Sequence, residues 1–309
     1  MSGPVLIDPE ELRAALPMEA AIDALESTFR EGRIPHAPPR TVVDLDHGEL
    51  LVMPAVGEAG AGVKLVTVAP GNPARGLPLI HAAYVLFDAG SLEPSAMIDG
   101  GALTALRTAA VSGVATRHLA RDGAERLVLF GAGVQATAHL ESMRAVRPIR
   151  EVVVVGRSPE RAAALVDAAR AGGLQARSGG PDAVAGADIV CACTTSATPL
   201  FDGGRLPPGA HVNAVGSYQP HTRELDDETI RRARIVVETR DAAMSEAGDL
   251  LIPLGAGVIS ASAIAADLAE LVGGARVRRD AEDVTVFKSV GVAFEDLVVA
   301  GAAVAAMAR

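Results

Sequence analysis

Short, continuous apolar runs separated by helical segments make up the second half of the chain. The runs LVLF, EVVVV, DIVCACT, HVNAV and RIVVET lie between residues 127 and 239, and segments such as ERAAALVDAARAGG connect them. Strands that are apolar along their whole length are typical of a parallel sheet with helices on both faces. We therefore predict a doubly wound parallel sheet over residues 117–285.

The first part of the chain has a different pattern. Residues 8–31 begin with Asp8-Pro9-Glu10, a helix-start signal, and then space their apolar positions by three and four, which predicts a helix. Apolar runs separated by turn residues predict a β-rich region over 40–99. Residues 100–121 are mostly small and predict a further helix.

The last segment, FKSVGVAFEDLVVAGAAVAAMA, also predicts a helix of small apolar residues and resembles 100–121 in composition. We expect it to pack back onto the first domain. The predicted fold class is α/β. A doubly wound sheet forms a domain at 117–285, and a discontinuous α+β domain comprises 1–116 and 286–309.

The composition limits the kinds of partner that the protein can bind and the cellular compartment in which we expect it. The 309 residues are 49% apolar, which suits two domains, and carry a formal net charge of −10. That charge argues against nucleic acid as a partner, because a phosphate-binding surface needs clustered Lys and Arg. No apolar window approaches the length of a membrane span, and the N-terminus lacks the basic start and apolar core of a secretion signal. We expect a cytoplasmic protein that does not bind membranes.

The two cysteines, Cys191 and Cys193, lie two positions apart in an apolar strand-like run and so share one face of a strand. We do not expect a disulfide between them, and no group of His, Cys or acidic residues has the spacing of a metal site. We interpret both cysteines as core residues in a reducing cytosol and predict no metal.

A dinucleotide fingerprint follows the strand LVLF. Gly131 allows a tight turn, Gly133 lets the backbone approach a pyrophosphate, and Ala136 lets the helix pack closely on the strand. The helix start then offers free N–H groups to phosphates. A second strand at 151–155 completes the βαβ context, which favours a Rossmann-type site over the alternative of a generic strand-to-helix turn.

The end of that second strand selects the cofactor. Enzymes that use NAD usually place an acid there, whereas this chain has Gly156-Arg157-Ser158. Arg157 can pair with a 2′-phosphate and Ser158 can donate a further hydrogen bond, which favours NADP. The alternative is a solvated loop arginine, and NAD remains possible.

Isolated cations in apolar surroundings are candidates for binding a carboxylate. Arg107 is the single charge between Asp99 and Arg117, and a buried guanidinium needs an anion, either an internal carboxylate or a ligand. Lys64 stands alone in the strand GVKLVTV, and Arg40 begins a strand after two prolines. Each also has a simpler interpretation, as a helix-end arginine, an edge-strand lysine and a surface arginine.

Together these segments resemble the ornithine cyclodeaminase/mu-crystallin family over nearly the whole chain. The similar segments are PPRTVV (38–43), GVKLVT (62–67), GLP (76–78), VLFD (85–88), MIDGGALTALRTAAVS (97–112), GAGVQA (131–136), AVAGADIV (183–190), PPGAHVNAVGSYQPHTRELDD (207–227), SEAGDL (245–250) and TVFKSVGVAFED (285–296). Members of the family are typically dimers, and their non-nucleotide domain supplies the dimer interface and much of the substrate site.

The resemblance implies roles for single residues. Arg40, Lys64 and Arg107 fall on positions that hold the substrate carboxylate. Cofactor contacts fall on Thr108, the fingerprint residues Gly131, Ala132, Gly133, Val134 and Gln135, and on Arg157, Ser158, Thr194, Thr195, Val215 and Ser289. The Gly-Arg-Ser sequence is more similar to the NADP-using ketimine reductase branch than to the cyclodeaminases, which carry an acid there.

One departure from the cyclodeaminase pattern bears on the reaction. Ornithine cyclodeaminases have a Gly-Gly-Asp-Cys-Pro-like turn with a catalytic Asp, and Tyr218 of GSYQP falls on that position. A phenol that is neutral near physiological pH cannot replace a carboxylate as a base or as the counter-ion of an ammonium. Ornithine cyclisation is therefore disfavoured. Tyr218 either lines the pocket and donates a hydrogen bond, or only packs.

The expected function is NAD(P)H-dependent reduction of a small, cyclic α-imino acid to the amino acid by a homodimer. The cofactor carries the chemistry, and the protein orients the substrate. Lys64 is the candidate proton donor, because neighbouring cations lower the pKa of a lysine. One alternative is an ornithine cyclodeaminase or an alanine-type amino-acid dehydrogenase. A second is a non-catalytic protein that binds NADPH and a small ligand.

Overall fold

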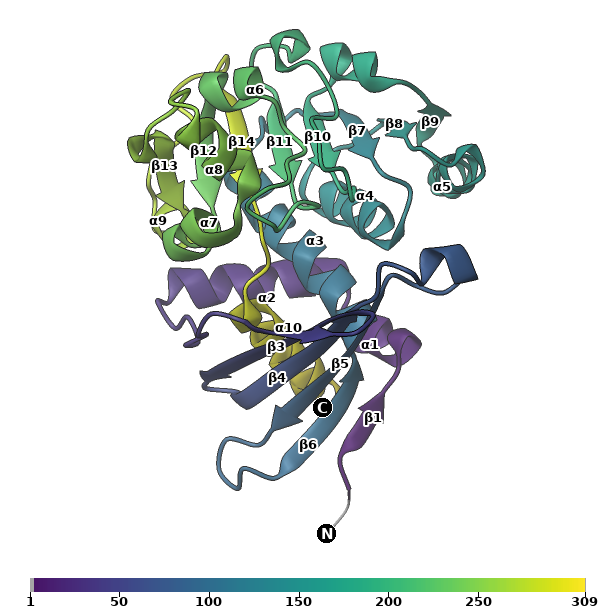
Figure 1. Cartoon of the computed structure of the whole chain (residues 1–309), viewed down its shortest axis with the longest axis vertical. Coiled ribbons are helices and arrows are strands. Elements are labelled where there is room, and N and C mark those ends of the chain that lie inside the picture. The colour runs from purple at the N-terminus through teal and green to yellow at the C-terminus, as the bar shows by residue number, and fades with distance from the viewer. Residues whose placement is uncertain (1–2, 309) are drawn as a thin grey trace. The chain divides into compact units, whose positions relative to one another are not determined.

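The computed structural model describes residues 3–308, which divide into two compact units (Figure 1). The first unit contains the chain up to Arg107 and from Val292 onward, and the second contains Thr108–Gly291. These boundaries differ from the predicted domain limits at 116/117 and 285/286. Helix α3 (Gly100–Leu119) begins in the first unit and continues into the second, and strand β14 (Val284–Lys288) belongs to the sheet of the second unit.

Within the described residues of the first unit, one sheet has six strands in the order β1-β6-β5-β4-β3-β2. Strands β2 to β6 pair antiparallel with their neighbours, and β1 is parallel to β6. This confirms the predicted β-rich region. The strands are β1 (Val5–Ile7), β2 (Thr41–Leu45), β3 (Gly48–Gly57), β4 (Gly60–Val68), β5 (Ile80–Phe87) and β6 (Pro94–Asp99).

The predicted helix over 8–31 is two helices, α1 (Pro9–Ala15) and α2 (Met18–Arg30). Pro17 separates them, because proline has no backbone N–H to continue the first helix and disfavours the helical conformation of the residue before it. At the start of α1 the Asp8 side chain accepts from the backbone N–H groups of Glu10 and Glu11, as the sequence predicted. A short 3₁₀ helix, η1 (Pro73–Arg75), follows β4.

Helix α10 (Ala293–Met307) covers one face of the first sheet and packs against β3, β4 and α2. The rings of Phe29 and Phe294 meet edge to face, with centroids 5.7 Å apart. The predicted last segment is divided in the structure. Helix α10 lies in the first unit, whereas Phe287 and Lys288 end β14, because the apolar run VTVF fills a central position of the second sheet.

In the part of the second unit that the structure describes, eight strands form a parallel sheet in the order β13-β12-β14-β11-β10-β7-β8-β9. The predicted doubly wound parallel sheet is therefore confirmed. Its strands are β7 (Arg126–Phe130), β8 (Glu151–Val155), β9 (Gln175–Ser178), β10 (Ile189–Ala192), β11 (His211–Ala214), β12 (Ala233–Val237), β13 (Ile264–Asp267) and β14. Its other elements are α4 (Val134–Val146), α5 (Pro159–Ala171), η2 (Pro181–Gly186), η3 (Gly203–Arg205), α6 (Asp227–Arg232), α7 (Arg240–Glu246), α8 (Gly248–Gly255), η4 (Ala261–Ala263) and α9 (Leu268–Val272).

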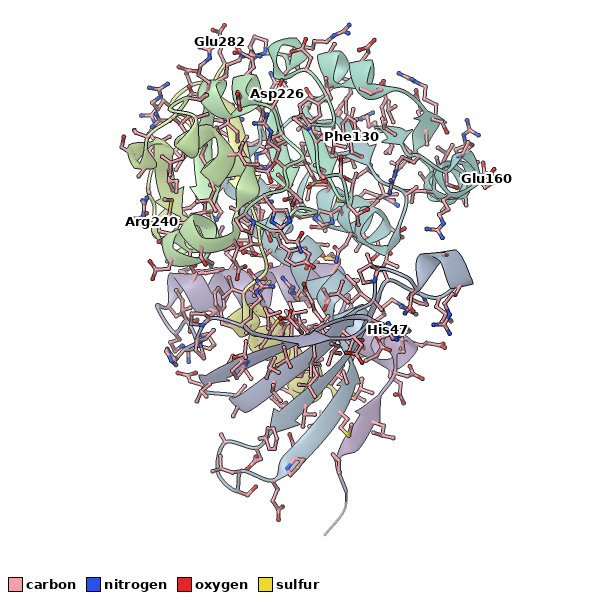
Figure 2. The ribbon with its side chains drawn as sticks, in the orientation of Figure 1. His47, Phe130, Glu160, Asp226, Arg240 and Glu282 are labelled. Atoms are coloured by element: carbon pink, nitrogen blue, oxygen red, sulfur yellow. The ribbon has the colours of Figure 1, made fainter. Side chains whose placement is uncertain are left out.

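Apolar cores lie on both faces of this sheet. Along β7, Leu127 and Leu129 belong to one core cluster, and Val128 and Phe130 belong to the other. Figure 2 labels Phe130 within this unit and the exposed Glu160 on α5. Cys191 is fully buried in the first cluster, in agreement with its predicted core position. No helix among residues 3–308 is long and apolar enough to cross a membrane.

Candidate active site

A buried ion pair lies between the sheet and α10 of the first unit. Lys64 is on the face of β4 that α10 covers, opposite Tyr84 on β5, and is only 1% exposed. Its ammonium donates to Asp296 on α10, with Nζ 2.9 Å from Oδ1 and 2.8 Å from Oδ2. The sequence interpretation of Lys64 as an edge-strand lysine is wrong, because β4 is an inner strand of the sheet.

Arg107 on α3 joins the same cluster. Its Nη1 donates to Glu295 Oε2 at 2.8 Å, and its Nε lies 3.3 Å from Asp296 Oδ1. Both acids are completely buried. The anion that a buried guanidinium requires is thus supplied from within the chain. The sequence analysis missed these acids, although the adjacent Glu and Asp in the otherwise apolar stretch AFEDLVVAG could have drawn attention to them.

The surroundings change the proton affinity of Lys64. Its pKa is lowered to about 8, chiefly by burial and also by the charges of Arg107 and Arg40, while Asp296 opposes the shift. Arg40, which is half-buried just before β2, is therefore close enough to act on Lys64. The structure brings together the three cations that the sequence singled out. The acids partly offset the repulsion among these cations and hold them in place.

Tyr84 lies beside Lys64 on the same buried face of the first sheet. Its hydroxyl has no hydrogen-bond partner within the part of the chain that the structure describes. A Cβ at Gly62 would lie 1.9 Å from that hydroxyl oxygen, so a glycine is required there. Burial raises the pKa of Tyr84 well above its ordinary value, and the negative charge of Asp296 raises it further. The hydroxyl therefore stays protonated.

The second unit has a cavity of about 470 Å³ at the carboxyl ends of β7, β8 and β10. Of the predicted cofactor contacts, Gly131, Ala132, Gly133, Arg157, Ser158, Thr194 and Thr195 line it. Gly131 has φ +106, and a Cβ on it would lie 2.5 Å from the carbonyl oxygen of Cys193, so only glycine fits this turn.

Other predicted contacts lie outside the lining of that cavity. Val134, which is 71% exposed, and Gln135 form the first turn of α4. Val215 follows β11, and Thr108 is buried in α3. Ser289 is 1% exposed, and its hydroxyl donates to Glu238 Oε1 at 2.5 Å.

Near the end of β8, Arg157 and Arg161 line the cavity, and Glu160 lies beside Ser158. Arg157 Nη2 donates to Thr195 Oγ1 at 3.3 Å. Ser158 caps α5 by accepting from the N–H of Arg161, and its hydroxyl donates to Glu160 Oε2 at 2.8 Å. The sequence analysis missed Glu160 and Arg161. An acid therefore lies near the proposed phosphate contacts, within the first turn of α5 rather than at the end of β8.

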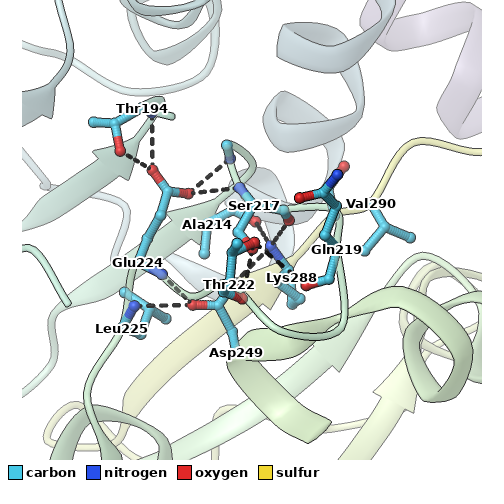
Figure 3. A network of polar contacts seen from close by, with 12 residues as sticks. Thr194, Ala214, Ser217, Gln219, Thr222, Glu224, Leu225, Asp249, Lys288 and Val290 are labelled. Atoms are coloured by element: carbon cyan, nitrogen blue, oxygen red, sulfur yellow. Dashed lines mark hydrogen bonds and ion pairs between the residues drawn. The ribbon is translucent and has the colours of Figure 1, made fainter. Parts of the chain in front are cut away.

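The loop GSYQP after β11, in the second unit, contains Tyr218, which the sequence analysis singled out. Tyr218 is half-buried and packs against a core cluster of the second unit. Glu224 accepts hydrogen bonds at Oε1 from the N–H of Thr194 (2.8 Å) and its hydroxyl (2.7 Å). At Oε2 it accepts from the N–H groups of Gly216 (2.7 Å) and Ser217 (3.2 Å) (Figure 3). One carboxylate therefore links the loops that follow β10 and β11.

Two further buried charges adjoin Glu224. Asp249 Oδ1 accepts from the N–H groups of Glu224 (2.7 Å) and Leu225 (2.9 Å). Lys288 Nζ lies 2.9 Å from Asp249 Oδ2 and donates to the carbonyl oxygens of Ser217 at 2.5 Å and Ala214 at 3.3 Å (Figure 3). Sequence reasoning did not single out these residues.

The chain is similar to a known family of proteins. Residues 5–305 match the ornithine cyclodeaminase/mu-crystallin family. The chain belongs to this family. The resemblance drawn from its sequence segments is thereby confirmed.

Named members of the ornithine cyclodeaminase/mu-crystallin family are similar over most of their length. A Delta(1)-pyrroline-2-carboxylate reductase of Bacillus cereus is 40% identical over 262 residues, which cover 81% of this chain and 79% of the relative. Ketimine reductase mu-crystallin of Mus musculus is 38% identical, and the match covers 96% of both chains.

A solved structure has the same fold. The Delta(1)-pyrroline-2-carboxylate reductase of Thermococcus litoralis, solved in complex with NADH and L-proline, has a TM-score of 0.94 and 33% identity, covering 98% of this chain and 97% of that chain. The predicted fold class, a Rossmann-type doubly wound sheet with a second α+β part, is confirmed for this family member.

Proposed function

We propose that this chain is an NAD(P)H-dependent reductase that converts small, cyclic α-imino acids to the corresponding amino acids. The observation that carries the proposal is the buried pair of Lys64 with Asp296 beside Arg107. This cluster occurs in a chain 40% identical to a Delta(1)-pyrroline-2-carboxylate reductase. The first unit has the substrate-binding role in this proposal, and the second unit binds the dinucleotide.

The residues of the first unit bind and orient the substrate. Arg40 and Arg107 attract the substrate carboxylate, and Asp296 and Glu295 hold the cations at fixed positions. Lys64 donates a proton to the imine nitrogen of a neutral substrate, whereas a substrate that enters already protonated carries this proton itself. A reduced nicotinamide, when bound, would supply the hydride for the imine carbon. The C=N bond becomes a C–N single bond, with one hydride and one proton gained.

The residues of the cavity fit a dinucleotide. The N–H groups at the start of α4 and the backbone at Gly133 suit a pyrophosphate. We assign NADP as the preferred cofactor, with NAD possible, because Arg157 and Arg161 both line the cavity. Glu160 opposes this preference by adding negative charge beside Ser158.

Oxidation of NADPH and NADH, followed by absorbance with a panel of five- and six-membered cyclic imino acids, tests the reaction. The same preparation is assayed for NAD-dependent ammonia release from ornithine and alanine. We expect turnover of a cyclic imine to exceed both. Ornithine turnover of equal size would favour the cyclodeaminase alternative and alanine turnover the dehydrogenase. Nucleotide binding without any turnover would favour the non-catalytic binder.

We also propose a homodimer formed through the first unit. Val43, Leu65 and Met97 are 44%, 39% and 41% exposed, and the strand register places them on the face opposite α10. An uncovered apolar sheet face suits a second copy of the chain. Leu65→Glu should convert the dimer to monomer in light scattering. Met244→Glu, at an exposed position of the second unit, should not. A monomeric parent protein would contradict the proposal.

A cytoplasmic location is part of the same proposal. Cys191 and Cys193 are both free thiols, and Cys191 is fully buried. A reducing compartment suits them.

A further inference from the structure

Glu224, Asp249 and Lys288 are fully or almost fully buried charges of the second unit and are not part of the glycine fingerprint. We propose that Glu224 is a positioning residue that fixes the loops after β10 and β11 in the arrangement that the cofactor requires, with Asp249 and Lys288 holding Glu224 in place. The proposal rests on the proposed function only in taking a nicotinamide dinucleotide as the ligand.

The donors to Glu224 come from both loops. Thr194 follows β10 and lines the cavity, whereas Gly216 and Ser217 follow β11. The Thr194 hydroxyl accepts from the N–H of Ser196 at 3.1 Å, so its own proton points to Glu224. Donors on both oxygens suit an ionised carboxylate, which only accepts. Ligands of open parallel sheets bind at these carboxyl ends, so Glu224 determines the backbone geometry of the cavity wall.

Asp249 and Lys288 stabilise the position of Glu224 through buried contacts. Asp249 fixes the backbone of Glu224 itself through the N–H groups of residues 224 and 225. Lys288 connects Asp249 to the carbonyl oxygen of Ser217, so both the N–H and the C=O of Ser217 have buried charged partners. Two carboxylates and one ammonium leave a negative charge that the backbone N–H groups must stabilise.

The two loops are also in direct backbone contact. A Cβ on Gly216 would lie 2.0 Å from the carbonyl oxygen of Thr194. A Cβ on Gly248 would lie 2.0 Å from the carbonyl oxygen of Thr222, at the other end of the GSYQP loop. At these two glycines the backbone segments approach so closely that no side chain fits between them. A displacement at Glu224 therefore moves Thr194 and the loop that contains Tyr218 together.

Asp188 provides a matched control. Its carboxylate also accepts from backbone N–H groups, those of Glu125 at 3.1 Å and Arg126 at 3.0 Å, and also pairs with arginine side chains. It precedes β10, at the amino end of the sheet, and does not line the cavity. Neutralising Asp188 costs hydrogen bonds of the same kind without touching the loops at the carboxyl ends.

The test compares Glu224→Gln with Asp188→Asn in the full chain. Gln keeps the shape of Glu but places an NH₂ group against N–H donors. We expect the dissociation constants of NADPH and NADH, measured by nucleotide fluorescence, to rise about tenfold or more in Glu224→Gln. Amide hydrogen exchange should quicken in peptides that contain Thr194 and Ser217. Asp188→Asn should lower Tm but leave nucleotide affinity within about twofold.

Unchanged nucleotide affinity in Glu224→Gln would overturn the proposal, and so would an equal loss in Asp188→Asn. If Glu224→Gln does not fold, the same measurements are made on Asp249→Asn. The Asn side chain still offers an acceptor to the N–H groups of Glu224 and Leu225, but it removes the negative charge opposite Lys288. Both readouts are independent of turnover. A parent protein that binds nucleotide but reduces no imine would therefore defeat the proposed function and leave this test intact.

Discussion

The ammonium of Lys64 lies 2.8 Å from Oδ2 of Asp296, although the two residues are 232 positions apart in the chain. This contact joins an inner strand to the C-terminal helix of the same unit. It gives a buried lysine a counter-ion while leaving its pKa low enough for proton transfer. The chemistry proposed for the first unit depends on the electrostatics of this pair.

The pH dependence of turnover should depend on Lys64. Burial and neighbouring cations lower its pKa to about 8, so the ammonium is present below that pH and is lost above it. If Lys64 donates the proton, kcat/KM for imine reduction is highest below pH 8 and falls about tenfold per pH unit above it. A pH–rate profile measures this. Lys64→Met should remove the alkaline decline together with most of the activity. A parent profile that stays level well above pH 8 would exclude Lys64 as the donor.

Asp296→Asn should move that alkaline decline to lower pH. Asp296 raises the pKa of Lys64, so removing its charge favours the neutral amine. The buried cluster also loses one partner, which should cost about 3–5 kcal/mol of stability and lower Tm. Glu295→Gln is the matched control, because Glu295 pairs with Arg107 and is not among the groups that shift Lys64. Equal shifts of the pH profile in both variants would contradict the assignment.

Local patterns in the sequence predicted the second sheet well, because a strand buried on both faces must be apolar along its length. The fingerprint was equally informative, since Gly131 is required by its backbone conformation and by its approach to Cys193. Strand β14 was misassigned in part. Its last residue, Lys288, is buried through contacts with Asp249 and two carbonyl groups that are distant in sequence.

The sequence identified the cations of the candidate site but not their partners. An isolated Arg107 in an apolar helix indicates that an anion is needed, but the requirement does not say whether the anion is a ligand or another segment of the chain. Pairing with Glu295 is a tertiary contact that no local periodicity encodes. The contacts of Glu224 are also tertiary, and the residues next to it in the sequence have the pattern of an ordinary loop.

Cofactor preference should respond in opposite directions to two substitutions at the end of the cavity. Arg157→Ala removes a cation from the proposed phosphate contact, and the NADPH/NADH ratio of kcat/KM should fall about tenfold. Glu160→Gln removes the acid beside Ser158, and the ratio should rise. Arg170→Ala, at the far end of α5, should leave it unchanged. A ratio that stays constant in both variants would show that the cavity does not contact a 2′-phosphate.

The two tyrosines of the chain should differ in their response to the loss of a hydroxyl. Tyr218→Phe keeps the ring that packs on the core and removes the proposed hydrogen bond, so kcat/KM should fall about tenfold while Tm changes little. Tyr84→Phe removes a buried hydroxyl that has no hydrogen-bond partner within residues 3–308, so both activity and Tm should be kept or slightly raised. Steady-state assays and thermal melts of the two variants make the comparison. Full activity in Tyr218→Phe would reduce Tyr218 to a packing residue, and the preference for imine reduction would then rest on the missing acid alone.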